Sequence, residues 1–320
     1  MAHALKLIRP IALVLLLAST VGVGAGQMSR EFHRTLGVPL AEAVSLRVDL
    51  LDGDLRIAYA RDGEVSISVT AQGAFSSDPE SLSTRLVIVE SGDRVEVREQ
   101  PGADSRNLRL TYAIDVPYRT EVHASLRHGK QTITGIMGPV NVEVGDGDLD
   151  LSYVSLGVSA QARTGNLSFE VVGGRIEAHT GQGNIICLRA SRGIDSETQD
   201  GDISLAVVGT SNAVVKHGSG RIDVRGAQGG LLASTTAGDL HVKAVPHEDW
   251  QLSSKSGTVR VELPPDFSFD LDAVSNSGDL VIVRNDLDKP PIGDRRLKQR
   301  ANGGGKRIEV RADSGKIVMS

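Results

Sequence analysis

Five aspartates each follow a glycine in a recurring phrase of the chain, and repeated carboxylates of this kind bind calcium in glycine-rich β-rolls. They are Asp54, Asp148, Asp202, Asp239 and Asp279. Ca²⁺ takes about six to eight oxygen ligands, so such a column would have to be continuous. Other residues stand at the same position in the remaining copies: Asn166, Asn184, Arg221, Thr258 and Lys316. Because an arginine or a lysine repels a cation, we predict that the column caps turns and binds no metal ion.

The other side chains that could ligate a metal or act as a nucleophile are dispersed. The chain has eight histidines and one cysteine. His179, His217 and His241 fall in different copies of the repeat and at different positions, so they lack the spacing of a zinc site. Cys187 occupies an apolar position, which favours a small core side chain over a nucleophile. We therefore predict no catalytic residue, no metal ligand and no cofactor.

A basic cluster near the C-terminal end is the remaining candidate. It comprises Arg295, Arg296, Lys298 and Arg300, within a segment rich in proline and glycine at 285–306. This composition is typical of a loop, so we expect a solvated basic loop over about 289–307. A polysaccharide-cleaving β-helix enzyme is the catalytic alternative, but such enzymes need protruding loops and paired acids in a cleft. Most turns here are too short for a cleft, and we predict that the protein is not an enzyme.

The elements that position these residues repeat with a short period. A turn glycine, a small polar residue and two apolar residues around a variable one recur every 18 or 19 residues from Gly147 to Gly257. The next two copies begin at Gly278 and Gly315, and the interval between them is close to two periods. A regular period of this length is the signature of a solenoid.

Each period holds two strands. Apolar or small residues also occur seven, five and three positions before each turn glycine, and this alternation is typical of a half-buried strand. Stacked coils would then bury ladders of equivalent residues. One expected ladder is Leu149, Leu167, Ile185, Ile203, Ile222, Leu240, Val259 and Leu280; a second is Leu151, Phe169, Cys187, Leu205, Val224, Val242, Val261 and Ile282. The predicted fold class is all-β, a parallel β-solenoid with coils of about 18 residues and two strands per coil, preceded by a β cap.

The N-terminal part of the chain departs from the period. One copy surrounds Gly53, and the period is lost between Tyr59 and Tyr118, where several strand-like runs occur. We expect residues 27–120 to form an N-terminal β cap or meander continuous with the solenoid. Residues 121–320 would form the solenoid repeats, interrupted by the excursion at 285–306.

The first 26 residues have the pattern of a secretory signal peptide. Lys6 and Arg9 precede an apolar core at 11–18, and small residues follow before Gln27. The apolar run is short for a membrane span, which needs about 20 residues. We expect cleavage and export to the periplasm, the cell envelope or the outside of the cell. The alternative is an uncleaved segment that associates the protein with a membrane.

Composition limits the choice of partner. The formal net charge is -5, whereas a nucleic-acid-binding protein needs a basic face for phosphates. Aromatic residues make up 3% of the chain and there are 36 glycines. Few aromatic residues and many glycines suit narrow, turn-rich coils.

The repeated phrase, as in Ser277-Gly278-Asp279-Leu280, is similar to that of the bacterial "putative adhesin" domains of unknown function with β-strand repeats. Ile114-Asp115-Val116-Pro117 ahead of the repeats fits the same pattern, and the resemblance covers about residues 43–320. It implies a β-helical protein of the envelope or the exterior, and it offers no catalytic residue.

Two non-catalytic functions follow from these observations. The first is an exported envelope or surface protein of adhesin type, which presents a repetitive β face to a protein or glycan ligand. The second is a periplasmic or membrane-anchored scaffold or sensor domain in envelope-stress signalling. Nucleic acid is not an expected partner of either.

Overall fold

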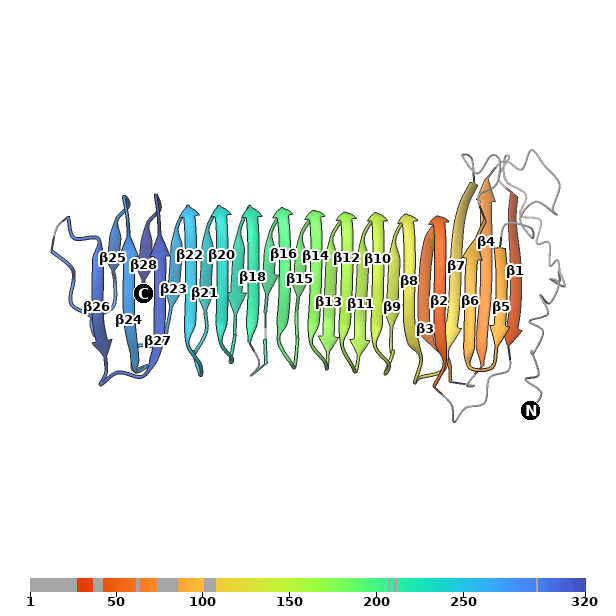
Figure 1. Ribbon diagram of the computed structural model, residues 1–320, viewed down its shortest axis with the longest axis horizontal. Helices are drawn as coiled ribbons and strands as arrows, with labels where there is room; N and C mark the ends of the chain where they lie inside the picture. The colour runs from red at the N-terminus through yellow and green to blue at the C-terminus, as the bar shows by residue number, and fades with distance from the viewer. Residues whose placement is uncertain are drawn as a thin grey trace, which may run out of the picture. The chain divides into compact units, whose positions relative to one another are not determined.

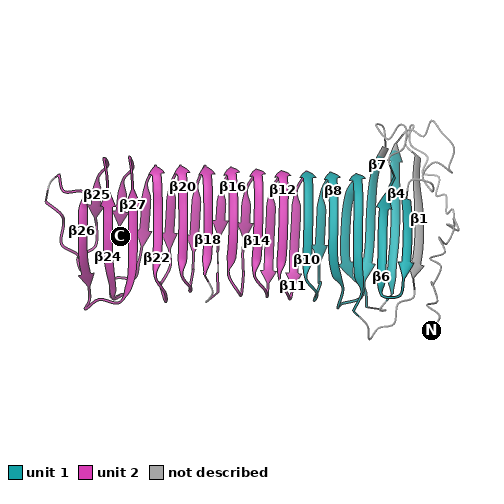
Figure 2. Cartoon of the chain, viewed as in Figure 1, with its two compact units in different colours: residues 1–145 teal, residues 146–320 magenta. Residues whose placement is uncertain are grey.

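The computed structural model describes residues 28–36, 43–61, 64–73, 86–100, 108–206, 208–209, 212–291 and 293–320. The predicted signal peptide at 1–26 lies outside these residues. They form two compact units, divided between Gly145 and Asp146 (Figure 2). The regular structure of the described residues consists of strands, and none of them belongs to a helix long and apolar enough to cross a membrane.

The second unit contains two mostly parallel sheets (Figure 1). Sheet A has the order β11-β13-β15-β17-β19-β21-β23-β28-β25, and sheet B the order β12-β14-β16-β18-β20-β22-β27-β24-β26. The strands of sheet A are β11 (Leu149–Val154), β13 (Leu167–Val172), β15 (Ile185–Cys187), β17 (Ile203–Leu205), β19 (Ile222–Arg225), β21 (Leu240–Lys243), β23 (Val259–Glu262), β25 (Leu280–Ile282) and β28 (Ile317–Met319). Those of sheet B are β12 (Val158–Thr164), β14 (Ile176–Gln182), β16 (Ile194–Asp200), β18 (Ala213–Ser219), β20 (Leu231–Ala237), β22 (Trp250–Ser256), β24 (Phe269–Ser275), β26 (Arg296–Ala301) and β27 (Lys306–Ala312).

The predicted ladders are present from β11 to β23. Leu149 pairs with Leu167, Leu167 with Ile185 and Ile185 with Ile203, and the series continues in register to Val259. Every residue of both ladders over this stretch is at most 2% exposed. Alternate side chains point away from the core, as the two-residue period of a strand requires. The parallel β-solenoid with two strands per coil is therefore confirmed.

The turn glycines stack backbone on backbone. Gly165 has a φ of 139°, and a Cβ atom built on it would lie 1.9 Å from the carbonyl oxygen of Gly147 in the neighbouring coil. Any other residue would meet both the strained φ and the clash. The glycine column therefore fixes the closest approach between coils.

The last coil in the sequence is not the last coil in space. β28 pairs with β23 on one side and with β25 on the other, and β27 lies in the same way between β22 and β24. The expected contact of Val259 with Leu280 is therefore wrong, because Ile317 lies between them. The period identifies each coil but not the order of stacking, since the long excursion after β25 lets the chain return to an inner position.

The excursion at 285–306 contains regular structure where a loop was expected. β26 pairs antiparallel with β24 and ends sheet B. Leu287, between β25 and β26, is 4% exposed. The buried Arg284 guanidinium donates hydrogen bonds to the carbonyl oxygens of Leu263 and Pro264 at 2.9 and 3.0 Å. The segment thus covers the outermost coil.

The strands of the first unit follow the orders β1-β4-β7-β3-β9 and β5-β6-β2-β8-β10. They are β1 (Met28–Leu36), β2 (Ser45–Asp52), β3 (Asp54–Tyr59), β4 (Val65–Gly73), β5 (Leu86–Ser91), β6 (Arg94–Glu99), β7 (Leu108–Val116), β8 (Glu121–His128), β9 (Gln131–Thr134) and β10 (Val140–Asp146). The early repeat copy forms β2 and β3, as its apolar pattern predicts. β2 lies between β6 and β8, and β3 between β7 and β9, so this coil also has an inner position.

The register of the ladders predicts a sharp contrast between adjacent residues. Leu205 is 1% exposed, whereas Ser204 points outward and is exposed. Leu205→Asp would bury an unpaired charge and should destabilise the fold by at least about 3 kcal/mol. Ser204→Asp should change the free energy of unfolding by about 0.5 kcal/mol or less. Denaturant midpoints measure both, and equal effects would contradict the register.

The inner position of the last coil predicts a selective disulfide. In the outward column of sheet B, Ser253 pairs with Arg311, and Arg311 pairs with Val274. In a Cys187→Ser background, cysteines at 253 and 311 should oxidise to a disulfide, because paired Cα atoms lie about 5 Å apart. Cysteines at 253 and 274 are two strand spacings apart and should stay reduced. Thiol titration checks both pairs, and the opposite result would indicate that the coils stack in their sequence order.

Candidate functional site

The column of aspartates and asparagines forms a hydrogen-bond ladder between coils. The carboxylate of Asp148 accepts from the backbone N–H of Asn166 at 2.8 Å, and the side-chain oxygen of Asn166 accepts from the N–H of Asn184 at 2.9 Å. The ladder continues through Asn184 to Asp202 at 2.7 Å and through Asp202 to Arg221 at 2.8 Å. Each side chain therefore caps the turn of the next coil. The described residues contain no group of three or more His, Cys, Asp or Glu side chains suited to a metal ion.

A second polar column lies inside the coils. The Thr180 hydroxyl donates to the carbonyl oxygen of Gly165 at 3.1 Å, and the Thr198 hydroxyl donates to that of Gly183 at 3.0 Å. His217 occupies the same position, where Nε2 donates to the carbonyl oxygen of Gly201 and Nδ1 contacts the Thr235 hydroxyl at 3.0 Å. These side chains satisfy buried turn carbonyls that would otherwise lack a partner. The sequence placed these positions inside but did not show which groups they bond.

Cys187 is a core residue, as predicted. It is 1% exposed, and burial raises the pKa of its thiol to about 12. A thiol that stays protonated at physiological pH is a poor nucleophile.

The three histidines that the sequence singled out lie apart. His179 is on the outer face of sheet B, where Nδ1 lies 3.9 Å from the carboxylate of Glu197. His217 is buried between the sheets, and His241 is on the outer face of sheet A. The structure does not bring them together.

The outer face of sheet A does assemble one charged cluster, from three successive strands. His241 Nε2 lies 3.1 Å from the Glu262 carboxylate, and Nδ1 lies 3.6 Å from that of Asp223. Lys243 pairs with Glu262 at 3.2 Å, and Arg225 pairs with Asp223 at 3.0 Å. Asp223 and His241 are paired in one column of the sheet, and Arg225, Lys243 and Glu262 form the adjacent column two residues along. Stacking by one coil therefore places these side chains side by side.

Both carboxyls of this cluster are held in the ionised form. Burial acts to raise the pKa of Asp223, but the hydrogen bond from Arg225 and the charges of Arg225, His241 and Arg221 outweigh it, and the pKa is lowered. Burial also acts to raise the pKa of Glu262, but hydrogen bonds from Lys243 and His241 outweigh it, and the pKa is lowered. The cluster is thus largely neutralised within itself.

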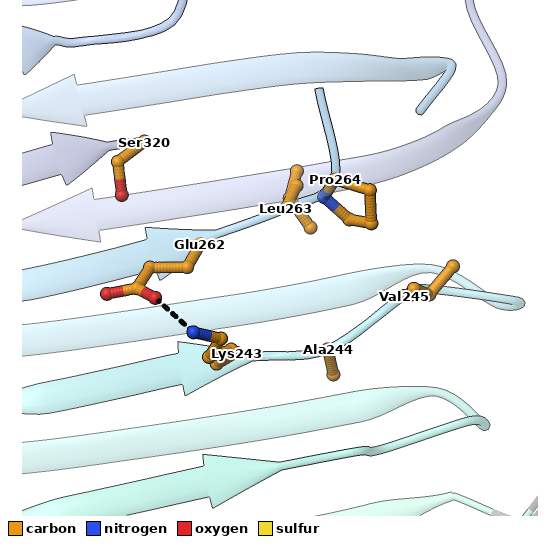
Figure 3. Close-up of a pocket in the computed structure, with 7 residues that line it drawn as sticks. All are labelled: Lys243, Ala244, Val245, Glu262, Leu263, Pro264 and Ser320. Carbon is orange, nitrogen blue, oxygen red and sulfur yellow. Dashed lines mark ion pairs between the residues drawn. The ribbon is translucent and has the colours of Figure 1, made fainter. Parts of the chain in front are cut away.

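A shallow pocket of about 400 Å³ adjoins the cluster (Figure 3). The ion pair of Lys243 and Glu262 forms one part of its lining. The remainder is Ala244, Val245, Leu263, Pro264 and Ser320. Among the described contacts, His241 hydrogen-bonds to Glu262 and to no serine, threonine or cysteine. The lining therefore combines apolar side chains with one ion pair.

The same face carries apolar side chains that the fold does not bury. Tyr153, Ile186 and Leu188 are 57%, 41% and 52% exposed. The Tyr153 hydroxyl reaches the Glu170 carboxylate at 3.4 Å. Ile186 is the variable position of the repeat phrase, and Tyr153 and Leu188 lie outside the phrase.

Part of this apolar surface is maintained against backbone strain. Tyr153 and Val171 occupy one corner of adjacent coils, each with a φ of 55°. A left-handed conformation costs a residue with a Cβ about 1–2 kcal/mol, and the equivalent corner residue Gly226 adopts a φ of 67° without that cost. Since Tyr153 is mostly exposed, burial does not offset its strain.

The basic cluster is the outward face of a strand. Arg296, Lys298 and Arg300 alternate along β26, and all three are exposed. Arg300 lies 3.5 Å from the Asp270 carboxylate on β24. Arg295 precedes the strand, and its guanidinium donates to the carbonyl oxygen of Asn276 at 3.0 Å.

Fold and surface together define a repetitive β-solenoid protein. Its turn and interior polar groups are hydrogen-bonded within the stack, and its charged cluster and exposed apolar side chains lie on the outer faces. The family model described as Toastrack DUF4097 matches residues 45–320. The chain therefore belongs to this family, which has no assigned function, and the resemblance drawn from the repeat phrase is confirmed.

The chain is similar to solved structures that include three from bacteria. A "putative cell adhesion protein" from Clostridium sporogenes ATCC 15579 is 12% identical with a TM-score of 0.25, over 91% of this chain and 98% of that one. A "putative adhesin" from Bacteroides fragilis NCTC 9343 is 12% identical with a TM-score of 0.42, over 91% and 97%. A "putative adhesin" from Parabacteroides distasonis ATCC 8503 is 13% identical with a TM-score of 0.29, over 93% and 98%. No curated protein matches the sequence.

The hydrogen-bond ladder predicts a matched pair of effects at Asn184. Asn184→Ala removes the acceptor of the Asp202 N–H and should lower the free energy of unfolding by about 0.5–1.5 kcal/mol. Asn184→Asp keeps the oxygen and should stay within about 0.5 kcal/mol of the wild type. Chemical denaturation measures both, and an equal loss in the two variants would show that the ladder does not contribute.

The charged cluster predicts a pH-dependent contribution from Asp223. Because its pKa is lowered in the folded state, ionised Asp223 stabilises the fold above the unfolded value of about 3.9. Asp223→Asn should be less stable than the wild type at pH 7. The difference should begin to shrink as the pH falls below about 4 and disappear below the lowered pKa of the folded state. Asp266→Asn, in an exposed loop, is the control and should show no such change. A pH-independent difference for Asp223→Asn would contradict the electrostatic account.

Proposed function

We propose that the chain is an exported, non-catalytic binding protein of adhesin type, and that the outer face of sheet A in the second unit is its binding face. The partner would be a protein or a glycan of the cell envelope or of another surface. The exposed apolar side chains of Tyr153, Ile186 and Leu188 carry this proposal. Their exposure does not stabilise the fold, and Tyr153 is retained at a strained corner where glycine is unstrained.

The composition of the face agrees with a binding role. Apolar and aromatic side chains lie over β11 to β15, and the Asp223–His241–Glu262 cluster lies over β19 to β23. Protein interfaces commonly combine an apolar, partly aromatic centre with a polar rim. A stacked sheet also keeps such side chains at fixed spacing, which limits the entropy lost on binding.

Export is proposed from the N-terminal pattern, and the absence of nucleic acid among the partners is proposed from the net charge of -5. A non-catalytic role is supported by the buried, protonated thiol of Cys187 and by the contacts of His241, which in the described part of the chain include no nucleophile.

One experiment with two readouts tests the proposal. Tagged protein is fractionated and its N-terminus sequenced, and we expect a start near Gln27 in an extracytoplasmic fraction. The purified chain is then tested for retention on immobilised envelope proteins and on a glycan array. Intact Met1 on a cytosolic protein would refute export, and release of reducing ends from envelope glycans would refute the non-catalytic role.

A matched pair of variants locates the binding face. Ile186→Ser with Leu188→Ser should weaken retention at least about tenfold, because both side chains lie on the outer face of sheet A. Leu232→Ser is the control, since Leu232 is 44% exposed on the outer face of sheet B. Equal losses in the two variants would contradict the choice of sheet A.

A further inference from the structure

The second unit leaves one edge of sheet B open at β26. This strand is the last in the order of sheet B and pairs with β24 on one side only. No other described strand lies beyond it, and Figure 1 shows it at the end of the coil stack. An open edge presents N–H and C=O groups that another extended segment can pair with.

The hydrogen-bond pattern shows which residues face the open side. The backbone N–H of Ser275 donates to the carbonyl oxygen of Arg295 at 2.8 Å, so Arg295 bonds toward β24. In an antiparallel pair the residues alternate in direction. Leu297 and Gln299 therefore also bond toward β24, and Arg296, Lys298 and Arg300 direct their backbone groups outward.

The same three residues carry positive charge at the outer face. All are exposed, and of the three only Arg300 forms an ion pair within the described part of the chain, with Asp270. The same three residues of β26 therefore present unpaired backbone groups at the edge of the sheet and cations on its outer face.

Acidic side chains on the neighbouring strands do not neutralise this row. Asp272 is paired by Arg311 at 3.1 Å and by Arg307 at 3.4 Å. The same two arginines pair with Glu309 at 2.9 and 3.1 Å. The two carboxylates and the two arginines of β24 and β27 thus balance each other, and the positive charge of β26 remains in excess.

We propose that β26 is a docking strand, which accepts an extended acidic segment of a partner protein as a further strand of sheet B. Backbone hydrogen bonds would give affinity, and carboxylates at alternate positions of the segment would face Arg296, Lys298 and Arg300. The same cations repel the equivalent edge of a second copy, which keeps the edge open. This surface is separate from the outer face of sheet A, and the proposal does not depend on export.

Synthetic peptides test the strand pairing directly. The full chain is titrated into a labelled peptide of about eight residues in which glutamate alternates with valine or threonine, and binding is followed by fluorescence anisotropy. We expect saturable binding that weakens with salt. A peptide of identical sequence with alternate amides N-methylated should not bind, because it cannot complete the ladder on that side. Absence of binding by the parent peptide, or equal binding by the methylated peptide or by unstructured polyglutamate, would overturn the proposal.

Variants of the chain separate the contribution of charge to binding from that of the backbone hydrogen bonds. Replacing Arg296, Lys298 and Arg300 together by glutamate should weaken binding at least about tenfold. Lys255→Glu, on the interior strand β22, is the matched control and should change it by less than about twofold. Lys298→Pro removes an outward N–H and should abolish binding, whereas Lys298→Ala should weaken it only modestly. Thermal unfolding is measured for each variant, and equal binding by folded Lys298→Pro and Lys298→Ala would refute strand pairing.

Discussion

The close stacking of one turn on the next is the constraint on which the rest of the second unit depends. The turn carbonyl of one coil occupies the space that a side chain of the next would need, as at Gly147 and Gly165. This contact sets the register to within one residue, and every column then follows from it. The apolar ladders, the Asp and Asn ladder and the buried hydroxyl column all depend on that single alignment. A shift by one residue would move each buried side chain to the outer face.

Register also explains why many polar side chains of the repeat are already engaged in hydrogen bonds within the stack. Tight turns leave backbone groups without a partner in their own coil, and those groups must be satisfied within a narrow core. Asn184 bonds the turn of the next coil, and Thr198 bonds the glycine carbonyl of the coil before. Even His217, which has the chemistry of a ligand or a base, is committed through both ring nitrogens. The outward side chains take no part in these hydrogen bonds, so their identity is free to vary from coil to coil.

The end of the stack poses a different problem, because an outermost coil has one unsatisfied side. In the second unit the chain places its last coil at an inner position and covers the outermost one with the segment after β25. Arg284 anchors this cover through the carbonyls of Leu263 and Pro264 and pairs with Asp286, whose pKa it lowers. The first unit also gives its early repeat copy an inner position. An inner coil is hydrogen-bonded on both sides, whereas an outermost coil has a neighbouring coil on one side only. The outermost positions are therefore occupied by segments that carry structure beyond the regular repeat.

The sequence by itself determined the fold class, the two strands per coil, the inward ladders and the core position of Cys187. These properties follow from glycine spacing and from two-residue alternation, which are local patterns. Tertiary structure alone decided that Ile317 separates Val259 from Leu280, because the order of coils depends on where a long excursion returns. It also decided that Arg296, Lys298 and Arg300 lie on a strand, since β24 supplies the hydrogen-bond partner that a proline- and glycine-rich segment lacks alone. The meeting of Asp223, His241 and Glu262 belongs to the same class: about 20 residues separate each from the next, and only stacking makes them neighbours.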